Sequence, residues 1–118
     1  MAHGDITHID IPVDDMVRAT NFYGKVLGWQ IAEVPGYEGY PMWRAPNEIS
    51  GGGFALRGGG LQHIRNYVEV DSIDDVLSKV QESGGAVVLE KTPISDTSWY
   101  AAFTDTEGNQ MGLYEGTT

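Results

Sequence analysis

The chain has 118 residues and no cysteine, and its 17 acidic residues exceed its seven basic residues to give a net charge of −10. This length predicts one domain with a core of its own, and the absence of cysteine excludes disulfides and thiolate chemistry. The negative field disfavours binding to nucleic acid or to an anionic membrane, although its simplest consequence is solubility. The sequence shows neither a signal-peptide pattern nor the ~20 apolar residues of a membrane span. We therefore expect a cytoplasmic protein that binds neither nucleic acid nor membrane.

The first half of the chain predicts a strand, a helix and three short strands. Residues 6–13 alternate between apolar and polar side chains, which predicts a half-buried strand with His8 and Asp10 on its polar face. Its apolar face carries Ile9, Ile11 and Val13. Residues 14–28 predict a helix, because apolar residues recur at three- and four-residue steps and Gly28 provides a left-handed end. Weaker strands are predicted at residues 29–34, 40–45 and 52–57.

The same order of elements returns after a glycine-rich joint at residues 58–62. Residues 63–70 alternate as a strand, and residues 72–85 predict a helix that begins with a pair resembling a capping box, Ser72 and Asp75. Three more strands are predicted at residues 86–90, 98–105 and 110–115. The order β-α-β-β-β therefore occurs twice.

The residues themselves support an internal repeat. Val13 and Asp14 match Val70 and Asp71, and Gly28 matches Gly85, with each pair 57 positions apart. We expect an α+β fold of two tandem βαβββ modules that form a cupped mixed β-sheet with helices on the outer face. The single domain would cover residues 1–118, with module one at about 5–57 and module two at about 63–115. The polar strand faces would then line a concave pocket, unless they are simply solvated.

Two glycine-containing segments need separate interpretation. Residues 51–60 (GGGFALRGGG) lack the Gly-Lys-Ser/Thr ending of a phosphate loop, so their glycines are interpreted as turns, a bulge and the joint. Residues 104–109 (TDTEGN) are too short for a calcium loop and predict a hairpin turn with Gly108 at positive φ.

Three stretches carry a pattern that resembles a known family. They are residues 8–29, a strand and a helix with a Phe-Tyr pair; residues 67–88, a strand and a helix ending in Gly-Gly; and residues 101–115, a D-x-E-G-N hairpin. In this order they resemble the vicinal oxygen chelate superfamily of glyoxalase I, bleomycin-resistance proteins and extradiol dioxygenases. The chain is most similar to small glyoxalase-like members whose last strand has Gly-Leu in place of Glu-Leu. The resemblance implies paired βαβββ modules and a homodimer.

The resemblance also implies where a metal would bind. Metal-using members place histidine or glutamine on the first strand of a module and glutamate on the last. The matching positions here are His8, Arg65, Ala55 and Gly112. Only His8 has a lone pair to offer, whereas a catalytic zinc site takes about three protein ligands. We expect no cofactor and no divalent metal, with a rearranged site that uses His63, Glu69 or Asp10 as the alternative.

The candidate catalytic residues are His8 and Arg65. His8 is either a general base or a structurally satisfied histidine. Arg65 either anchors an anionic group of a substrate or pairs with a nearby carboxylate. The candidate ligand-binding residues are Asp10, Trp43, His63, Tyr67, Trp99 and Tyr114. The aromatic members of this set would either stack on a ligand or pack within the core.

Two classes of function follow from the resemblance. The first is a binding protein of the bleomycin-resistance kind, which binds or sequesters an unidentified small molecule in an aromatic, metal-free pocket. The second is a metal-independent isomerase or lyase, related to lactoylglutathione lyase, with His8 as base and Arg65 as anion anchor. True glyoxalase I activity and dioxygenase activity are disfavoured, because both need the metal.

Overall fold

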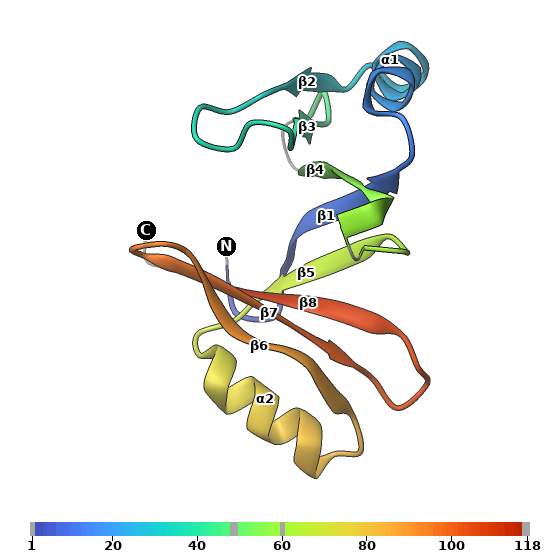
Figure 1. The fold of residues 1–118 in the computed structure, drawn as a ribbon. Helices are drawn as coiled ribbons and strands as arrows, with labels where there is room; N and C mark the ends of the chain where they lie inside the picture. The colour runs from blue at the N-terminus through green and yellow to red at the C-terminus, as the bar shows by residue number, and fades with distance from the viewer. Residues whose placement is uncertain (1, 48–49, 60, 117–118) are drawn as a thin grey trace. The chain divides into compact units, whose positions relative to one another are not determined.

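A computed structural model of the chain describes residues 2–47, 50–59 and 61–116. The elements of the first half are β1 (Ile6–Val13), α1 (Met16–Leu27), β2 (Gln30–Ala32), β3 (Met42–Arg44), β4 (Gly51–Leu56) and a short 3₁₀ turn, η1 (Arg57–Gly59). The elements of the second half are β5 (Arg65–Glu69), α2 (Ile73–Glu82), β6 (Ala86–Ser95), β7 (Ser98–Thr104) and β8 (Gln110–Gly116) (Figure 1). The predicted α+β fold with two βαβββ modules is confirmed.

The chain divides into two compact units, which are described separately. The first unit is Thr7–Arg65, and the second combines the segment up to Ile6 with the residues from Asn66 onward. The predicted joint, residues 58–62, lies within the first unit, and its Gly60 is outside the described residues. The single domain over residues 1–118 and the cupped shape stay predictions.

The sheet of the first unit has the strand order β2-β3-β4-β1, and α1 packs on one of its faces. β1 and β4 are parallel, with Ile11 opposite Phe54, and the other two pairs are antiparallel. Since β1 alternates, its apolar residues point to the helix side. The buried core there consists of Ile11, Val13, Trp43 and Phe54. A nearly parallel stack of Tyr23, Trp29 and Trp43 extends this core, with successive ring centroids 5.1 and 3.7 Å apart.

Both ends of α1 follow the sequence. Asp15 is the N-cap, and its side chain accepts a hydrogen bond of 2.9 Å from the Arg18 N–H. Gly28 ends the helix in the left-handed region with φ of 72°, where a residue with a Cβ is strained. Gly24 lies inside the helix and does not have the left-handed conformation of Gly28. A Cβ at Gly24 would make only ordinary contacts, at 3.7 Å or more.

We therefore predict that Gly24→Ala raises the free energy of unfolding by about 0.5–1 kcal/mol, because alanine loses less conformational entropy in a helix. Urea unfolding followed by circular dichroism measures the change. The control is Gly28→Ala, which we expect to lower the same free energy by roughly 1 kcal/mol. A destabilising Gly24→Ala would contradict the packing described for α1.

The sheet of the second unit has the order β5-β8-β7-β6, and α2 lies on one face (Figure 1). β5 and β8 are parallel, with Val68 opposite Leu113. The buried core between helix and sheet consists of Val70, Ile73, Leu77, Ala101 and Leu113. The predicted cap is confirmed, because Ser72 accepts a hydrogen bond from the Asp75 N–H. No helix in the described ranges is both long enough and apolar enough to cross a membrane.

Several predicted strand boundaries are wrong by one or more residues, and those of β5 and β6 matter most. β6 continues to Ser95, five residues beyond the predicted end, and includes Pro93. β6 is the outer strand of its unit's sheet, so a proline without an N–H is tolerated there. β5 begins at Arg65, so His63 precedes the strand and is exposed.

The predicted hairpin turn between β7 and β8 is confirmed, with φ of 85° at Gly108. Its centre is the carboxylate of Asp105, which accepts hydrogen bonds from the backbone N–H groups of Asn109 (2.9 Å) and Glu107 (2.8 Å) and from the Asn109 side chain (3.1 Å). These bonds, the backbone bond from Asn109 foremost, lower the pKa of Asp105 because they stabilise the charged carboxylate.

A lowered pKa in the folded state means that Asp105 contributes stability above its unfolded pKa and loses it as the pH falls through its folded pKa. We predict that Asp105→Asn lowers the melting temperature near neutral pH, and that its difference from wild type shrinks on acidification below the ordinary aspartate range. Thermal melts across the acidic range measure this difference. Asp96→Asn, in the turn between β6 and β7, is the control for loss of charge alone. A difference that does not depend on pH would contradict the role of the charged carboxylate.

Candidate functional site

His8, Asp10 and Tyr40 form a hydrogen-bonded cluster in the first unit. The Nε2 atom of His8 lies 2.9 Å from Oδ1 of Asp10 and 2.6 Å from the hydroxyl oxygen of Tyr40. The Tyr40 hydroxyl also donates a short hydrogen bond to Oδ1 of Asp10. The side chain of His8 is 31% exposed and that of Asp10 is 13% exposed. The cluster is thus a partly buried polar site that remains accessible to solvent.

Three segments of the first unit position this cluster. The two-residue period of β1 directs His8 and Asp10 to the face opposite its core residues, as predicted. Tyr40 comes from the loop between β2 and β3, directly after Gly39 at φ of 82°. Gly53 on β4 lies opposite Asp10, and a Cβ at Gly53 would overlap the ring of Tyr40. A glycine is therefore required under the tyrosine.

The cluster fixes the state of the imidazole. An ionised carboxylate only accepts hydrogen bonds, so the short distance between His8 and Asp10 places a proton on Nε2 of His8. Both donors, the Tyr40 hydroxyl and the His8 N–H, then point at Asp10, which compensates for its burial. Chemically, this arrangement offers a ligand one carboxylate acceptor and one imidazole donor.

The last-strand positions contain no metal ligand. In the parallel pair of the second unit, Gly112 lies opposite Tyr67, the repeat counterpart of Asp10. Gly53, opposite Asp10, is therefore the counterpart of Gly112, and the predicted assignment of Ala55 is wrong by two residues. Each of these glycines lies under a tyrosine ring, because a Cβ at Gly112 would overlap Tyr67.

Across residues 2–47, 50–59 and 61–116, no group of three or more histidine, aspartate or glutamate side chains is close enough to hold a metal ion. Within the cluster, only His8 and Asp10 belong to these residue types. The described side chains therefore do not fit the metal that the family resemblance implies.

The other charged candidates lie at or near β5. Arg65 is the first residue of that strand, is half-buried and makes at least one contact in the structure. His63 is exposed in the segment before β5 and does not share a strand face with Arg65, contrary to the prediction. Among the predicted site residues, the structure thus brings together His8 and Asp10.

The aromatic candidates divide between the two faces of their sheets. Trp43 is 4% exposed and stacks on Trp29 in the core, which matches the packing alternative. Trp99 packs on the helix side of the second unit, and the Lys91 ammonium lies 4.6 Å from its ring centroid. Tyr67 and Tyr114 alternate with core residues and occupy the opposite face. On that face Tyr67 is buried and Tyr114 is half-buried, and their role in ligand binding stays a prediction.

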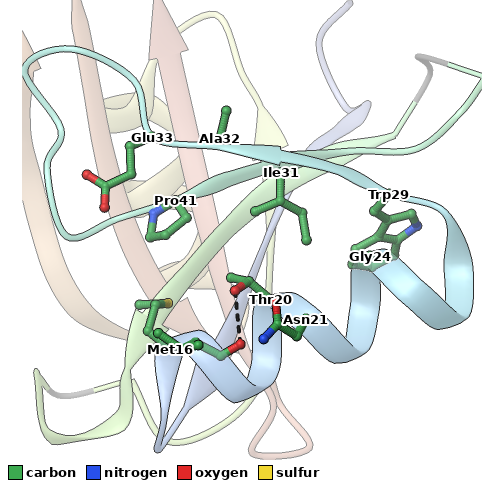
Figure 2. Close-up of a pocket in the computed structure, with 10 residues that line it drawn as sticks. Met16, Thr20, Asn21, Gly24, Trp29, Ile31, Ala32, Glu33 and Pro41 are labelled. Carbon is green, nitrogen blue, oxygen red and sulfur yellow. Dashed lines mark hydrogen bonds between the residues drawn. The ribbon is translucent and has the colours of Figure 1, made fainter.

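An open cavity of about 470 Å³ lies elsewhere in the first unit, between α1 and the segment from Trp29 to Pro41. Figure 2 shows Met16 and Thr20 on the helix facing Ile31 and Pro41 across the gap. Met16 and Ile31 also pack against the core, so this cavity opens on the helix side. It shares no lining residue with the cluster of His8, Asp10 and Tyr40. We assign the chemistry to that cluster, because the cavity contains no comparable set of hydrogen-bonded polar groups.

Sequence reasoning did not identify Tyr40. The signal that could have indicated it is Gly53, because a glycine inside a strand often marks a close approach by another group. The sequence predicts a strand over residues 52–57 and interprets its glycines as turns or a bulge, whereas Gly53 in β4 marks the close approach of Tyr40.

We predict that Gly53→Ala lowers the free energy of unfolding by about 1–3 kcal/mol, because the new methyl group must displace the Tyr40 ring. Chemical denaturation measures the loss, and NMR of the tyrosine ring reports the displacement. Gly58→Ala is the matched control, since a Cβ there meets no atom within 4 Å. If both variants were equally stable and the Tyr40 signals were unchanged, the close contact would be refuted.

Comparisons with known proteins give consistent results. The family model described as bleomycin resistance protein-like N-terminal matches residues 5–43, which contain all three members of the cluster. The chain is 31% identical over 114 residues to "Putative glyoxylase CFP32" of Mycobacterium bovis, covering 91% of this chain and 44% of that protein. This chain thus spans less than half the length of that curated relative. It is also 25% identical to a "Glyoxylase-like domain-containing protein" of Didymella fabae, covering 94% of this chain and 93% of that protein.

Solved structures share the fold. Methylmalonyl-CoA epimerase from Mycobacterium tuberculosis matches with a TM-score of 0.70 at 16% identity, covering 98% of this chain and 89% of that one. A glyoxalase/bleomycin resistance protein/dioxygenase superfamily member from Vibrio splendidus matches with a TM-score of 0.66 at 14% identity. This match covers 92% of this chain and 96% of that one. At these identities the likeness concerns the fold alone.

Proposed function

Since the chain is a member of the glyoxalase/bleomycin-resistance superfamily and has the vicinal oxygen chelate fold, we propose that it binds a small organic molecule without a metal ion. The cluster of His8, Asp10 and Tyr40 is the observation that carries this proposal. It is a preformed, half-buried set of donors and acceptors on a sheet face. Sites for small molecules typically contain a few such polar groups in a fixed arrangement.

Two features favour binding over catalysis. A general base must present a lone pair to its substrate, but the ring nitrogen of His8 that lies within the cluster, Nε2, carries the proton directed at Asp10. The net charge of −10 also disfavours an anionic ligand, which most substrates with phosphate or carboxylate groups would be. A neutral or cationic molecule that exchanges hydrogen bonds with the cluster fits both features.

A metal-independent isomerase or lyase is the second candidate. The observation in its favour is the contact between Asp10 and His8, because a carboxylate that orients an imidazole is a common arrangement around a catalytic base. In this alternative Arg65 would hold an anionic group. The likeness to a structure named methylmalonyl-CoA epimerase is compatible with it but rests on the fold.

The metal-free proposal predicts that untagged protein retains less than about a tenth of a metal ion per chain after dialysis against zinc, nickel, manganese and iron(II). Elemental mass spectrometry measures the retained metal. The protein should instead gain stability from a neutral or cationic compound in a thermal-shift screen, by about 2.7 kcal/mol at a hundredfold excess over Kd. Near-stoichiometric metal would overturn the proposal.

The effect of His8→Ala separates the two candidates. For a binding protein we expect the affinity for a compound found in that screen to change less than about tenfold, since the Asp10 carboxylate remains. For an enzyme, turnover should fall by about 10²–10⁴. Calorimetric titration and a substrate-turnover assay measure the two quantities, with the exposed His63→Ala as the matched control.

A further inference from the structure

We infer that the ligand of this cluster is a phenol, meaning a planar aromatic ring with a hydroxyl group, and that Tyr40 occupies its position in the unliganded chain. The inference rests on the proposed binding function and names the chemical class that the site accepts. Three observations support it: the hydrogen-bond partners of the Tyr40 hydroxyl, the groups in contact with the Tyr40 ring, and the position of Tyr40 on a loop.

The surroundings of the Tyr40 hydroxyl select for a neutral O–H group. Oδ1 of Asp10 accepts its proton, and Nε2 of His8 lies 2.6 Å from its oxygen. The single Nε2 hydrogen of His8 is then shared between Asp10 and the Tyr40 oxygen, so the group at this position both donates to a carboxylate and accepts from an imidazole N–H. A carboxylate ligand would be repelled by Asp10, and an ammonium has no lone pair for His8. A hydroxyl group satisfies both partners.

The surroundings of the Tyr40 ring select for a flat group. One side of the ring lies against Gly53, where even a methyl group would overlap it. The imidazole of His8 is inclined by only 22° to the tyrosine ring, with a centroid distance of 6.2 Å. The space that Tyr40 fills beside Gly53 and the imidazole therefore accommodates a flat ring, and an aliphatic alcohol would make fewer contacts there.

The attachment of Tyr40 allows an exchange. Tyr40 lies on the loop of residues 33–41, in which Gly36 and Gly39 have positive φ. Backbone hydrogen bonds from Tyr37 to Val34 and from Tyr40 to Tyr37 stay within this loop. Rotation of the Tyr40 side chain about its own bonds leaves them intact. A phenol from solution can thus take over the same two hydrogen bonds without rearranging a strand.

The experiment uses the Tyr40→Ala variant of the full chain with p-cresol as probe, which reproduces the lost side chain. Calorimetric titration should show p-cresol binding at least about tenfold more tightly than toluene, which lacks the hydroxyl. Tyr40→Ala should also bind p-cresol at least about tenfold more tightly than wild type, in which Tyr40 competes. Tyr37→Ala, from the same loop and 38% exposed, is the matched control and should behave as wild type.

Equal binding of p-cresol and toluene, or no binding by a folded Tyr40→Ala chain, would overturn the inference. If the variant does not fold, NMR of tyrosine-labelled wild type replaces it. Saturating p-cresol should then move the Tyr40 ring signals toward those of an exposed tyrosine and leave Tyr37 unchanged. Unchanged Tyr40 signals up to the solubility limit of p-cresol would refute the exchange.

The results also distinguish this inference from the function on which it depends. A screening compound without a hydroxyl that binds wild type through Asp10, combined with failure of p-cresol, would refute the phenol and keep the binding function. Binding of p-cresol by Tyr40→Ala, combined with a wild type that binds no small molecule, would overturn the binding function and support the recess described for Tyr40.

Discussion

The parallel pairing of β1 with β4 is the constraint on which the site depends. It places Ile11 beside Phe54 in the core and Asp10 beside Gly53 on the opposite face. Because side chains alternate strictly along both strands, a shift of one residue would exchange the two faces and expose the core. The packing of Phe54, which is fully buried, therefore also fixes the position of the glycine that receives Tyr40.

The second unit meets the same constraint with different side chains. β5 and β8 are also parallel, Leu113 takes the place of Phe54 in its core, and Gly112 lies under the ring of Tyr67. In both units a strand glycine is covered by a tyrosine, once from a loop and once from the adjacent strand. This recurrence explains why neither position can supply a metal-binding carboxylate, since a glutamate there would need the space of the ring.

The sequence predicted those features that depend on local physical chemistry. The alternation of β1, the end of α1 at Gly28, the cap of α2 at Ser72 and the turn at Gly108 each follow from a few neighbouring residues. Tyr40 escaped prediction because its contacts with His8 and Asp10 span 32 and 30 positions. Ala55 was assigned wrongly for a related reason: a fixed repeat offset does not account for the two-residue difference between the parallel registers.

The burial of Asp10 explains why the other two members of the cluster direct their hydrogen-bond donors at it. A carboxylate only 13% exposed is unfavourable unless donors compensate for its lost hydration, and here an imidazole N–H and a phenol O–H supply them. Any molecule that displaces Tyr40 must therefore bring its own donor, or else leave Asp10 without its shorter hydrogen bond. The need of one carboxylate for hydrogen-bond donors thus sets the chemistry that this face can accept.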